Sequence, residues 1–205
     1  MSAQTIFPMV AMLRNAVLTL VALAIAIGVG GGSVWYALDA QSGIGAIRIG
    51  PWTAFPDMGT PDADPYSQAR VAREGVLALG RAEGLAFVAE RDSDGQPLRR
   101  ECAYTIEGQF PTARFWTLYA ADQSLDAIDT GRPRPAALHS YEILRRPDNS
   151  AVISAGRHPA PGNWLLVPGT GALYFVLTFY DTPIASSTGL SDVRLPRITR
   201  GSCDA

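Results

Sequence analysis

The most distinctive pattern along the chain is a long apolar run near its N-terminus. No charged side chain lies between Arg14 and Asp39, and residues 16–38 read AVLTLVALAIAIGVGGGSVWYAL. A helix needs about 20 apolar residues to cross the hydrocarbon core of a bilayer, so the run predicts a transmembrane helix over 15–38 that acts as a signal anchor. The alternative is a cleaved signal peptide, whose apolar core is shorter, about 7–15 residues. A signal peptide is cleaved at a site with small residues, and cleavage after Ser33 would meet this requirement.

The charges at the two ends of this run predict its orientation. Arg14 precedes it and Asp39 follows it, and positive charge near a membrane helix favours the cytoplasmic side. We therefore expect residues 1–14 in the cytoplasm and the rest of the chain in the periplasm, held by one pass through a bacterial inner membrane. Gly28 and Gly32 have a spacing that lets two membrane helices approach closely, although glycines also fray a helix end.

Glycine and proline are frequent in residues 39–64, which predicts an extended linker with one short strand at 46–49. Asp64 and Pro65 then form a helix start, with Asp as the N-cap and Pro in the first turn. An amphipathic helix of about 17 residues should follow. Its apolar positions recur every three or four residues and are Tyr66, Ala69, Ala72, Val76, Leu79 and Ala82.

After Gly84 the apolar positions alternate with a period of two, which is typical of strands. Turn-forming residues at 92–95 and 147–149 indicate two hairpins. The expected strands cover 85–90, 99–108, 114–122, 139–146, 151–154, 163–167, 173–180 and 192–199. The chain should therefore be mainly β, with an antiparallel β-sandwich domain over 65–205.

The most apolar part of this region is the segment 163–183, NWLLVPGTGALYFVLTFYDTP. Its eight-residue run LYFVLTFY is too short to cross a bilayer as a helix. A phosphate-binding loop would need GxxxxGK[ST] before a helix, but here Gly169 and Gly171 lie between two expected strands and the chain has no Lys. The pattern instead predicts a hairpin in the core of a sheet, in which the glycines form the turn and the second strand is a central one covered on both faces.

Composition narrows the function classes. The 17 basic residues, all Arg, nearly balance 19 acidic ones, and no basic run appears, so a nucleic-acid partner is not expected. The use of Arg alone points to a GC-rich bacterial genome. The two cysteines, Cys102 and Cys203, favour a disulfide in an oxidising compartment, although two unpaired thiols remain the alternative.

Several segments together resemble the bacterial domain-of-unknown-function family 1214. Phe115–Tyr119 is similar to its Phe-Trp-Ser/Thr-Leu-Thr-Tyr strand, shortened by one residue. Asn163, Trp164, Leu165 and Pro168 are similar to its Asn-Trp-Leu-Pro-x-Pro segment, with Leu166 in place of the first Pro.

The resemblance covers residues 104–183, where Asp148-Asn149 replaces the Asp-Gly hairpin of the family. It implies a jelly-roll-like sandwich and a short, membrane-anchored member of a family that is often fused to domain family 1254. The family has no agreed activity, so the resemblance implies no catalytic residue.

Candidate chemistry is sparse. His139 and His158 are the only histidines, which is too few for a metal site of the cupin type, and no GxSxG motif is present. We expect no metal, no cofactor and no assigned catalytic residue. A Ser–His–Asp set that uses Ser186, Ser187 or Ser191 stays open, because such triads are geometric rather than sequential.

Aromatic side chains are the better candidates for binding a sugar or an extended peptide. The residues that we single out are Trp116, Tyr119, Trp164, His139 and Arg145, with Tyr174 and Tyr180 as further candidates. Core packing is the alternative for each ring.

Three functions follow as hypotheses. The first is a membrane-anchored periplasmic module that binds a small molecule or an envelope protein. The second is an envelope hydrolase, in which one of the two histidines would be essential. The third is a subunit of a membrane complex that docks through Gly28 and Gly32.

Overall fold

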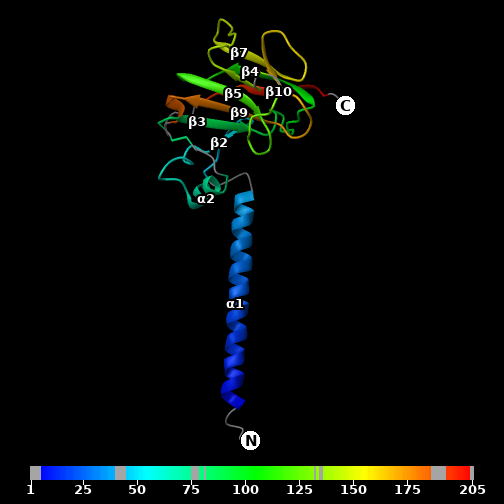
Figure 1. Cartoon of the computed structure of the whole chain (residues 1–205). Helices are drawn as coiled ribbons and strands as arrows, with labels where there is room; N and C mark the ends of the chain where they lie inside the picture. Colours follow the sequence, from blue (N-terminus) through cyan, green and yellow to red (C-terminus); the bar gives the residue numbers. More distant parts are fainter. Residues whose placement is uncertain are drawn as a thin grey trace. The chain divides into compact units, whose positions relative to one another are not determined.

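The computed structural model describes residues 6–39, 45–74, 79–80, 82–131, 133, 136–185 and 193–203. The chain divides into two compact units, Met1–Ile44 and Gly45–Ala205. The described part of the first unit is a single helix, α1 (Ile6–Asp39), and the second unit is called the β domain below (Figure 1).

α1 is longer than the predicted helix at both ends. Its segment Met12–Tyr36 is long and apolar enough to cross a membrane, as judged by length and composition alone. Every side chain of this segment is exposed within the chain itself. The helix therefore meets the length requirement for a membrane span, and a signal sequence would meet the same test.

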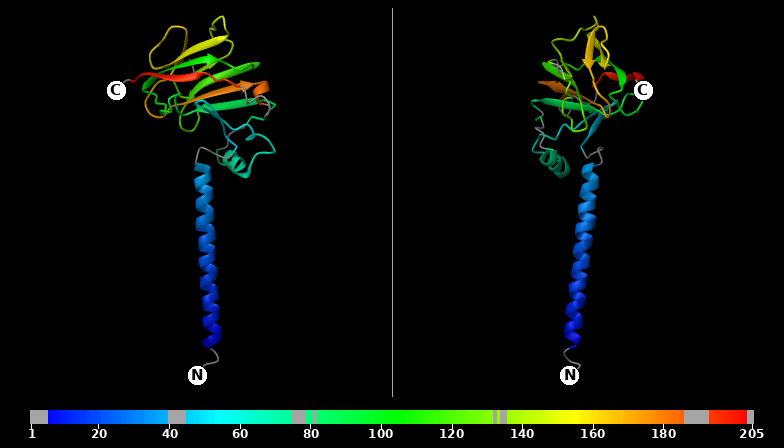
Figure 2. Two further views of the ribbon diagram at one scale, coloured as in Figure 1. Left: turned by 180° about the vertical axis from the view of Figure 1, so that it is seen from behind. Right: turned by 45° about the vertical axis from the view of Figure 1, so that its right-hand side comes forward.

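The β domain is built from two sheets that form separate layers (Figures 1 and 2). The six-stranded sheet has the order β1-β2-β3-β9-β5-β6 and the four-stranded sheet the order β10-β4-β7-β8. The strands are β1 (Ile47–Ile49), β2 (Trp52–Ala54), β3 (Gly84–Ala89), β4 (Cys102–Gln109), β5 (Phe115–Ala121), β6 (Ala137–His139), β7 (Ser150–Gly156), β8 (Asn163–Leu166), β9 (Tyr174–Tyr180) and β10 (Arg197–Cys203). The predicted mainly β class is confirmed.

One strand pair departs from the antiparallel expectation. β7 and β8 are parallel, with Ile153 opposite Asn163 and Gly156 opposite Leu166. The connection 157–162 contains two prolines and a glycine, Gly162, with a φ of +82°. This connection brings the chain back next to Ile153, so that β8 runs in the same direction as β7 and not in the opposite direction as in a hairpin. The four-stranded sheet therefore contains both parallel and antiparallel pairs.

β9 is the central strand that the sequence predicts. It pairs with β3 on one side and β5 on the other. Phe175, Leu177 and Phe179 face the core, where the ring of Phe175 meets that of Tyr104 from β4 edge to face at 5.9 Å. Val176 on the opposite face is also buried. Both faces of β9 are therefore covered.

The predicted linker needs a correction, because the β domain begins at Gly45 and not at residue 65. β1 and β2 pair with each other, and β2 also pairs with β3. Trp52 of β2 is fully buried, and its indole N–H donates to the carbonyl oxygen of Pro196 at 2.7 Å. Burial of Trp52 thus helps to hold a proline- and glycine-rich segment in the sheet, together with Ala54 and the partly buried Ile47 and Ile49.

The helix after Asp64 starts as predicted but is shorter. α2 spans Pro65–Glu74, and the Asp64 carboxylate accepts a hydrogen bond from the backbone N–H of Ser67, as an N-cap does. Ala69 and Ala72, expected on the buried stripe, are exposed, whereas Ser67 is buried. Alanines offer little apolar area to bury, so the spacing of these residues did not predict which face of the helix is buried. Val76 lies outside the described residues.

Two predicted strands also differ. Of 139–146, only His139 lies in a strand, β6, and the chain then turns, with the N–H of Glu142 bonded to the carbonyl of His139. The last strand begins at Arg197 rather than 192, because Pro196 cannot donate to a sheet. The turn at 147–149 is confirmed by an isolated bridge between Arg145 and Ala151.

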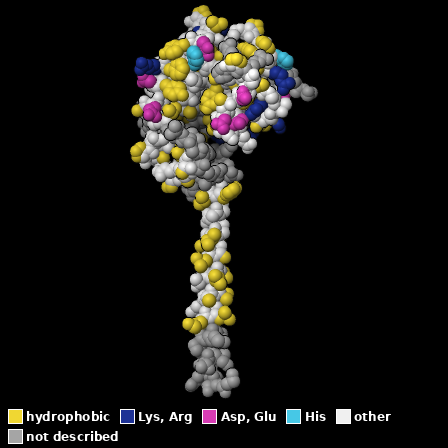
Figure 3. Space-filling view, in the orientation of Figure 1, with side chains coloured by type: hydrophobic (Ala, Val, Ile, Leu, Met, Phe, Trp, Pro, Cys, Tyr) yellow, Lys and Arg dark blue, Asp and Glu magenta, His cyan; other side chains and the backbone are white. Residues whose placement is uncertain are grey.

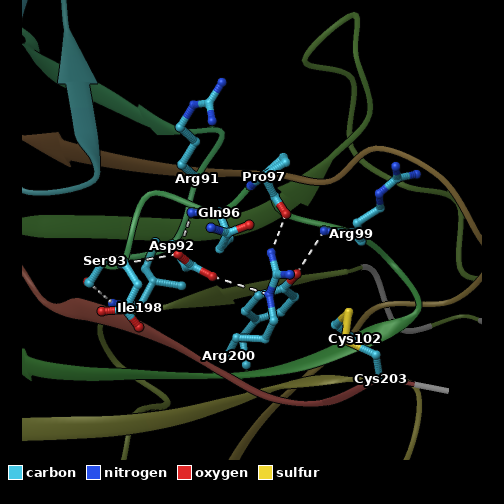
Figure 4. A network of polar contacts seen from close by, with 12 residues as sticks. Arg91, Asp92, Ser93, Gln96, Pro97, Arg99, Cys102, Ile198, Arg200 and Cys203 are labelled. Carbon is cyan, nitrogen blue, oxygen red and sulfur yellow. Dashed lines mark hydrogen bonds and ion pairs between the residues drawn. A yellow bond between two sulfur atoms is a disulfide. The ribbon is translucent and has the colours of Figure 1, made fainter.

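The turn at 92–95 closes a short hairpin, but the chain then crosses from the six-stranded to the four-stranded sheet. The buried Asp92 carboxylate accepts the backbone N–H groups of Asp94 and Gln96 through Oδ1. Its Oδ2 lies 3.2 Å from Nε of Arg200 on β10, and Arg200 also donates to the carbonyl of Pro97 (Figure 4). The hairpin is therefore fixed to the last strand.

Cys102 and Cys203 form the predicted disulfide. They are directly opposite each other in β4 and β10, with a Cα–Cα distance of 3.9 Å (Figure 4). The bond joins residues 101 positions apart and holds the end of β10 against β4.

Gly169 and Gly171 serve the turn geometry that the sequence predicts, but the predicted hairpin is wrong, because β8 and β9 belong to different sheets. Both have positive φ, +85° and +106°. The N–H of Gly171 donates to the Glu101 carboxylate at 2.9 Å, and Arg157 donates to the carbonyl of Gly169 at 2.9 Å. The hydrogen bond from Gly171 is the chief reason why the pKa of Glu101 is lowered. Charged neighbours thus hold this loop between β8 and β9.

Candidate binding face

The structure separates the five binding residues that the sequence singles out. Trp116 points from β5 into the core, is 2% exposed and stacks on Phe110 with ring centroids 4.4 Å apart. Arg145 lies near it, with the guanidinium carbon 5.8 Å from the ring centroid of Trp116. This placement favours core packing as the role of Trp116.

Trp164 lies in the other sheet, on β8. It is half-buried, and its indole N–H donates to the carbonyl of Gly156 at 3.2 Å. Trp164 and Tyr119 therefore belong to different layers and do not line one common surface.

Tyr119 and His139 do share a surface. In the pairing of β5 with β6, His139 is opposite Thr117 and Ala137 is opposite Tyr119. Because alternate residues of a strand point to the same side, Tyr119 and His139 both lie on the side of the six-stranded sheet that faces away from the core. Tyr119 is half-buried, and this burial raises the pKa of its hydroxyl.

Phe115 is the centre of an aromatic cluster on that outer side. Its ring centroid lies 5.8 Å from His139, 5.5 Å from Tyr141 and 5.8 Å from Tyr180. The interplanar angles are 35–37°, so the rings lie side by side with a tilt rather than stacked. We call Phe115, Tyr119, His139, Tyr141 and Tyr180 the aromatic face.

The aromatic face is open to solvent at one point above all. Tyr141 is 76% exposed, and Tyr141 and Leu144 are the only large hydrophobic residues of the described β domain that are so exposed. In the view of Figure 3, hydrophobic side chains gather beside a histidine that lies next to an acidic side chain.

Two polar side-chain pairs border the rings. Arg114 Nη1 lies 3.7 Å from Asp181 Oδ2, and His139 Nε2 lies 3.4 Å from Glu142 Oε1. Within the described part of the chain, Nδ1 of His139 is buried without a hydrogen-bond partner. The margin therefore offers hydrogen-bonding groups next to an apolar surface.

A buried asparagine fixes the turn that carries Tyr141. The Nδ2 of Asn163 donates to the carbonyls of Leu144 at 2.8 Å and Val152 at 2.9 Å, and its Oδ1 accepts the N–H of Leu144 at 2.7 Å. The Tyr141 hydroxyl in addition donates to the carbonyl of Arg114 at 3.3 Å. Exposed rings on a fixed turn bind with little loss of conformational entropy.

Sequence reasoning missed Phe115 and Tyr141. Phe115 is next to Trp116, and the period-two pattern does show that the two rings point to opposite faces, but not which face is the core. Tyr141 was expected in a strand and lies in a turn. The Tyr180 candidate does belong to the aromatic face.

The described residues offer little for hydrolysis or metal binding. No group of three His, Cys, Asp or Glu side chains that could hold a metal occurs among them. The hydroxyl of Ser140, next to His139, accepts the N–H of Trp116 at 3.3 Å. Ser186, Ser187 and Ser191, the serines considered for a triad, lie outside the described residues.

Comparison with known proteins gives a family and a fold. Residues 83–184 match the family described as "Protein of unknown function (DUF1214)". No curated protein matches the chain.

The chain is similar to several solved structures. One is the VPA0106 protein from Vibrio parahaemolyticus, with 21% identity and a TM-score of 0.55 over 69% of this chain and 36% of that one. Another is an uncharacterised protein from Burkholderia cenocepacia, with 15% identity and a TM-score of 0.41 over 90% of this chain and 53% of that one. The chain thus spans about a third of the first and about half of the second, and the first likeness supports the fold.

Proposed function

We propose a function from geometry, because this chain belongs to the DUF1214 family over residues 83–184 and that family has no described activity. The protein is a membrane-anchored module that binds an envelope ligand on its aromatic face. The observation that carries the proposal is the Phe115 cluster with the 76% exposed ring of Tyr141. Contiguous exposed apolar side chains with a polar border are typical of binding sites.

The anchor in this proposal is α1. Its segment Met12–Tyr36 has the length and composition of a membrane span. Arg14, near the N-terminal end of this segment, favours a cytoplasmic N-terminus, and the Cys102–Cys203 disulfide suits the oxidising periplasm of a bacterium. The β domain would then stand in the periplasm, attached to the inner membrane.

Location is tested by adding protease to spheroplasts that contain the full chain. We expect the protease to digest the β domain while residues 1–14 stay protected. Mass spectrometry of the undigested protein should show that the N-terminal residues 1–33 are still attached. A β domain that resists protease until the membrane is dissolved would contradict the periplasmic placement. An N-terminus beginning at residue 34 would contradict the anchor.

Binding is tested by hydroxyl-radical footprinting of the full chain in its own membranes and after purification into lipid nanodiscs. A bound ligand should lower the oxidation of Tyr141 and Tyr180 in the native membrane several-fold. Trp164, in the other sheet, is the control and should be oxidised equally in both samples. Equal oxidation of Tyr141 in the two samples would overturn the proposal.

The hydrolase hypothesis has one supporting contact, that of His139 with Glu142. His158→Ala and Tyr141→Ser separate the two functions. A binding module keeps the phenotype of the full chain when His158 is replaced, and loses it when Tyr141 is replaced by Ser. A hydrolase that works through His158 would show the reverse.

A further inference from the structure

We infer that the ligand of the aromatic face is a neutral saccharide, an inference that rests on the binding function proposed above. The apolar part of the face is a set of tilted rings around Phe115, at centroid distances of 5.5–5.8 Å. The faces of aromatic rings carry partial negative charge. They therefore attract the C–H groups on one side of a sugar ring, whose hydrogens are slightly positive.

The border of the face suits hydroxyl groups. Glu142 and Asp181 offer acceptors, while Arg114 and the hydroxyl of Tyr180 offer donors, all next to the rings. A sugar hydroxyl can donate and accept at once, so it can satisfy either kind of group.

The charge of the face favours a neutral ligand over an ionic one. Arg114 is matched by Asp181 at 3.7 Å, and Glu142 lies 3.4 Å from the imidazole of His139. An anion such as phosphate would lie next to the carboxylates of Asp181 and Glu142, and a cationic group would lie next to the guanidinium of Arg114. A saccharide without charge avoids both repulsions.

The experiment uses the full chain in phosphatidylcholine nanodiscs, which contain no sugar headgroups. Saturation-transfer difference NMR is recorded with three neutral trisaccharides, namely chitotriose, cellotriose and maltotriose. We expect transfer from the protein to the ring C–H protons of at least one of them. Tyr141→Ser should weaken the binding of that sugar about 10-fold or more, as the loss of a central aromatic contact does.

Two further variants keep the test sharp. Phe115→Leu keeps an apolar side chain but removes the central ring, and it should weaken binding to a similar degree. Trp164→Phe changes a ring in the other sheet and should leave binding within about two-fold. The disulfide and the amide-exchange pattern of β9 show that each variant is folded.

The saccharide inference is overturned if none of the three sugars receives transfer, or if Tyr141→Ser binds as tightly as the unchanged chain. These failures are distinct from failure of the binding function. If Tyr141 is protected in native membranes but the sugars do not bind, the face binds another class of ligand, such as an extended peptide. If Tyr141 is not protected either, both proposals are wrong.

Discussion

The side chain of Asn163 forms two hydrogen bonds with the backbone of Leu144: Oδ1 accepts the N–H at 2.7 Å and Nδ2 donates to the carbonyl at 2.8 Å. A third bond reaches the carbonyl of Val152. The carboxamide thus makes hydrogen bonds to backbone groups that a neighbouring strand would otherwise make. These bonds explain why a polar Asn is buried next to Trp164.

Replacing Asn163 by Asp should destabilise the β domain, because a carboxylate cannot donate to the carbonyls of Leu144 and Val152. Buried acceptors left without donors cost about 1–3 kcal/mol each, so a loss of about 3 kcal/mol is expected in urea unfolding of the full chain in detergent. Hydrogen exchange should show the N–H of Leu144 opening earlier. Asn149→Asp, at an exposed turn, is the control and should change stability by less than about 0.5 kcal/mol.

The buried ion pair should matter more than the exposed one. Asp92→Ala leaves Arg200 without its carboxylate and the hairpin N–H groups without an acceptor, for a loss of about 3 kcal/mol. Asp92→Asn keeps an acceptor oxygen and should lose about half as much. Glu107→Gln, which removes a solvent-exposed pair with Arg146 at 2.6 Å, should cost less than about 1 kcal/mol. Equal losses for Asp92→Asn and Glu107→Gln would show that burial does not decide the difference.

Cys203→Ser should loosen the last strand before the rest of the domain. The chain-entropy argument assigns a loop of about 100 residues up to about 4–5 kcal/mol. Amide exchange in β10 should rise, while β9, at the centre of the other sheet, keeps its protection. The chain has two cysteines, so thiol titration should give no free thiol before reduction and two after it. Unchanged exchange in β10 would mean that the Arg200 contacts suffice to hold the strand.

The acid response of the 147–149 turn can be read at Asp148. Its carboxylate accepts the hydroxyl of Ser150 at 2.7 Å and the N–H of Ser150 at 3.1 Å, and these bonds lower the pKa of Asp148. A lowered pKa in the folded state means that stability is present above the unfolded pKa of about 3.9 and is lost as the pH falls through the folded value. Ser150→Ala removes the shorter bond, so the Asp148 midpoint should rise in a carboxylate NMR titration. The midpoint of Glu101 should not move.

Gly84 at the start of β3 tolerates no side chain. A Cβ there would lie 2.1 Å from the carbonyl oxygen of Phe179, whereas a Cβ at Gly156 would lie 3.5 Å from its nearest neighbours. Gly84→Ala should therefore destabilise the domain by about 2 kcal/mol or more, and Gly156→Ala by much less. Thermal unfolding followed by near-UV circular dichroism compares the two variants. Similar midpoints would contradict the clash.

Strong local patterns gave the correct elements. The alternation in 173–180 predicted β9 and its coverage on both faces, Asp64-Pro65 predicted the start of α2, and the two cysteines predicted the disulfide. Each of these depends on sequence-local rules or on a single pair of residues.

Features that depend on distant partners could not be predicted. Trp52 joins the sheet because its indole finds the carbonyl of Pro196, 144 positions away. The turn after His139 exists because Asn163 holds Leu144. The sequence shows that the adjacent rings of Phe115 and Trp116 point to opposite faces of the sheet. Which face is buried depends on the second sheet, which covers Trp116. The candidate face was therefore half identified, through Tyr119, His139 and Tyr180.

Cys203 of β10 follows Cys102 of β4 by 101 positions, and this separation has a consequence for biosynthesis. β4 lacks its partner on one side, and Cys102 lacks the sulfur that it bonds, until residue 203 has left the ribosome. At about 5–20 residues per second, the four-stranded sheet stays incomplete for several seconds after β4 emerges. The nascent β domain thus reaches its native form only once residue 203 has emerged, and until then the open side of β4 is accessible to chaperones and to other unfinished chains.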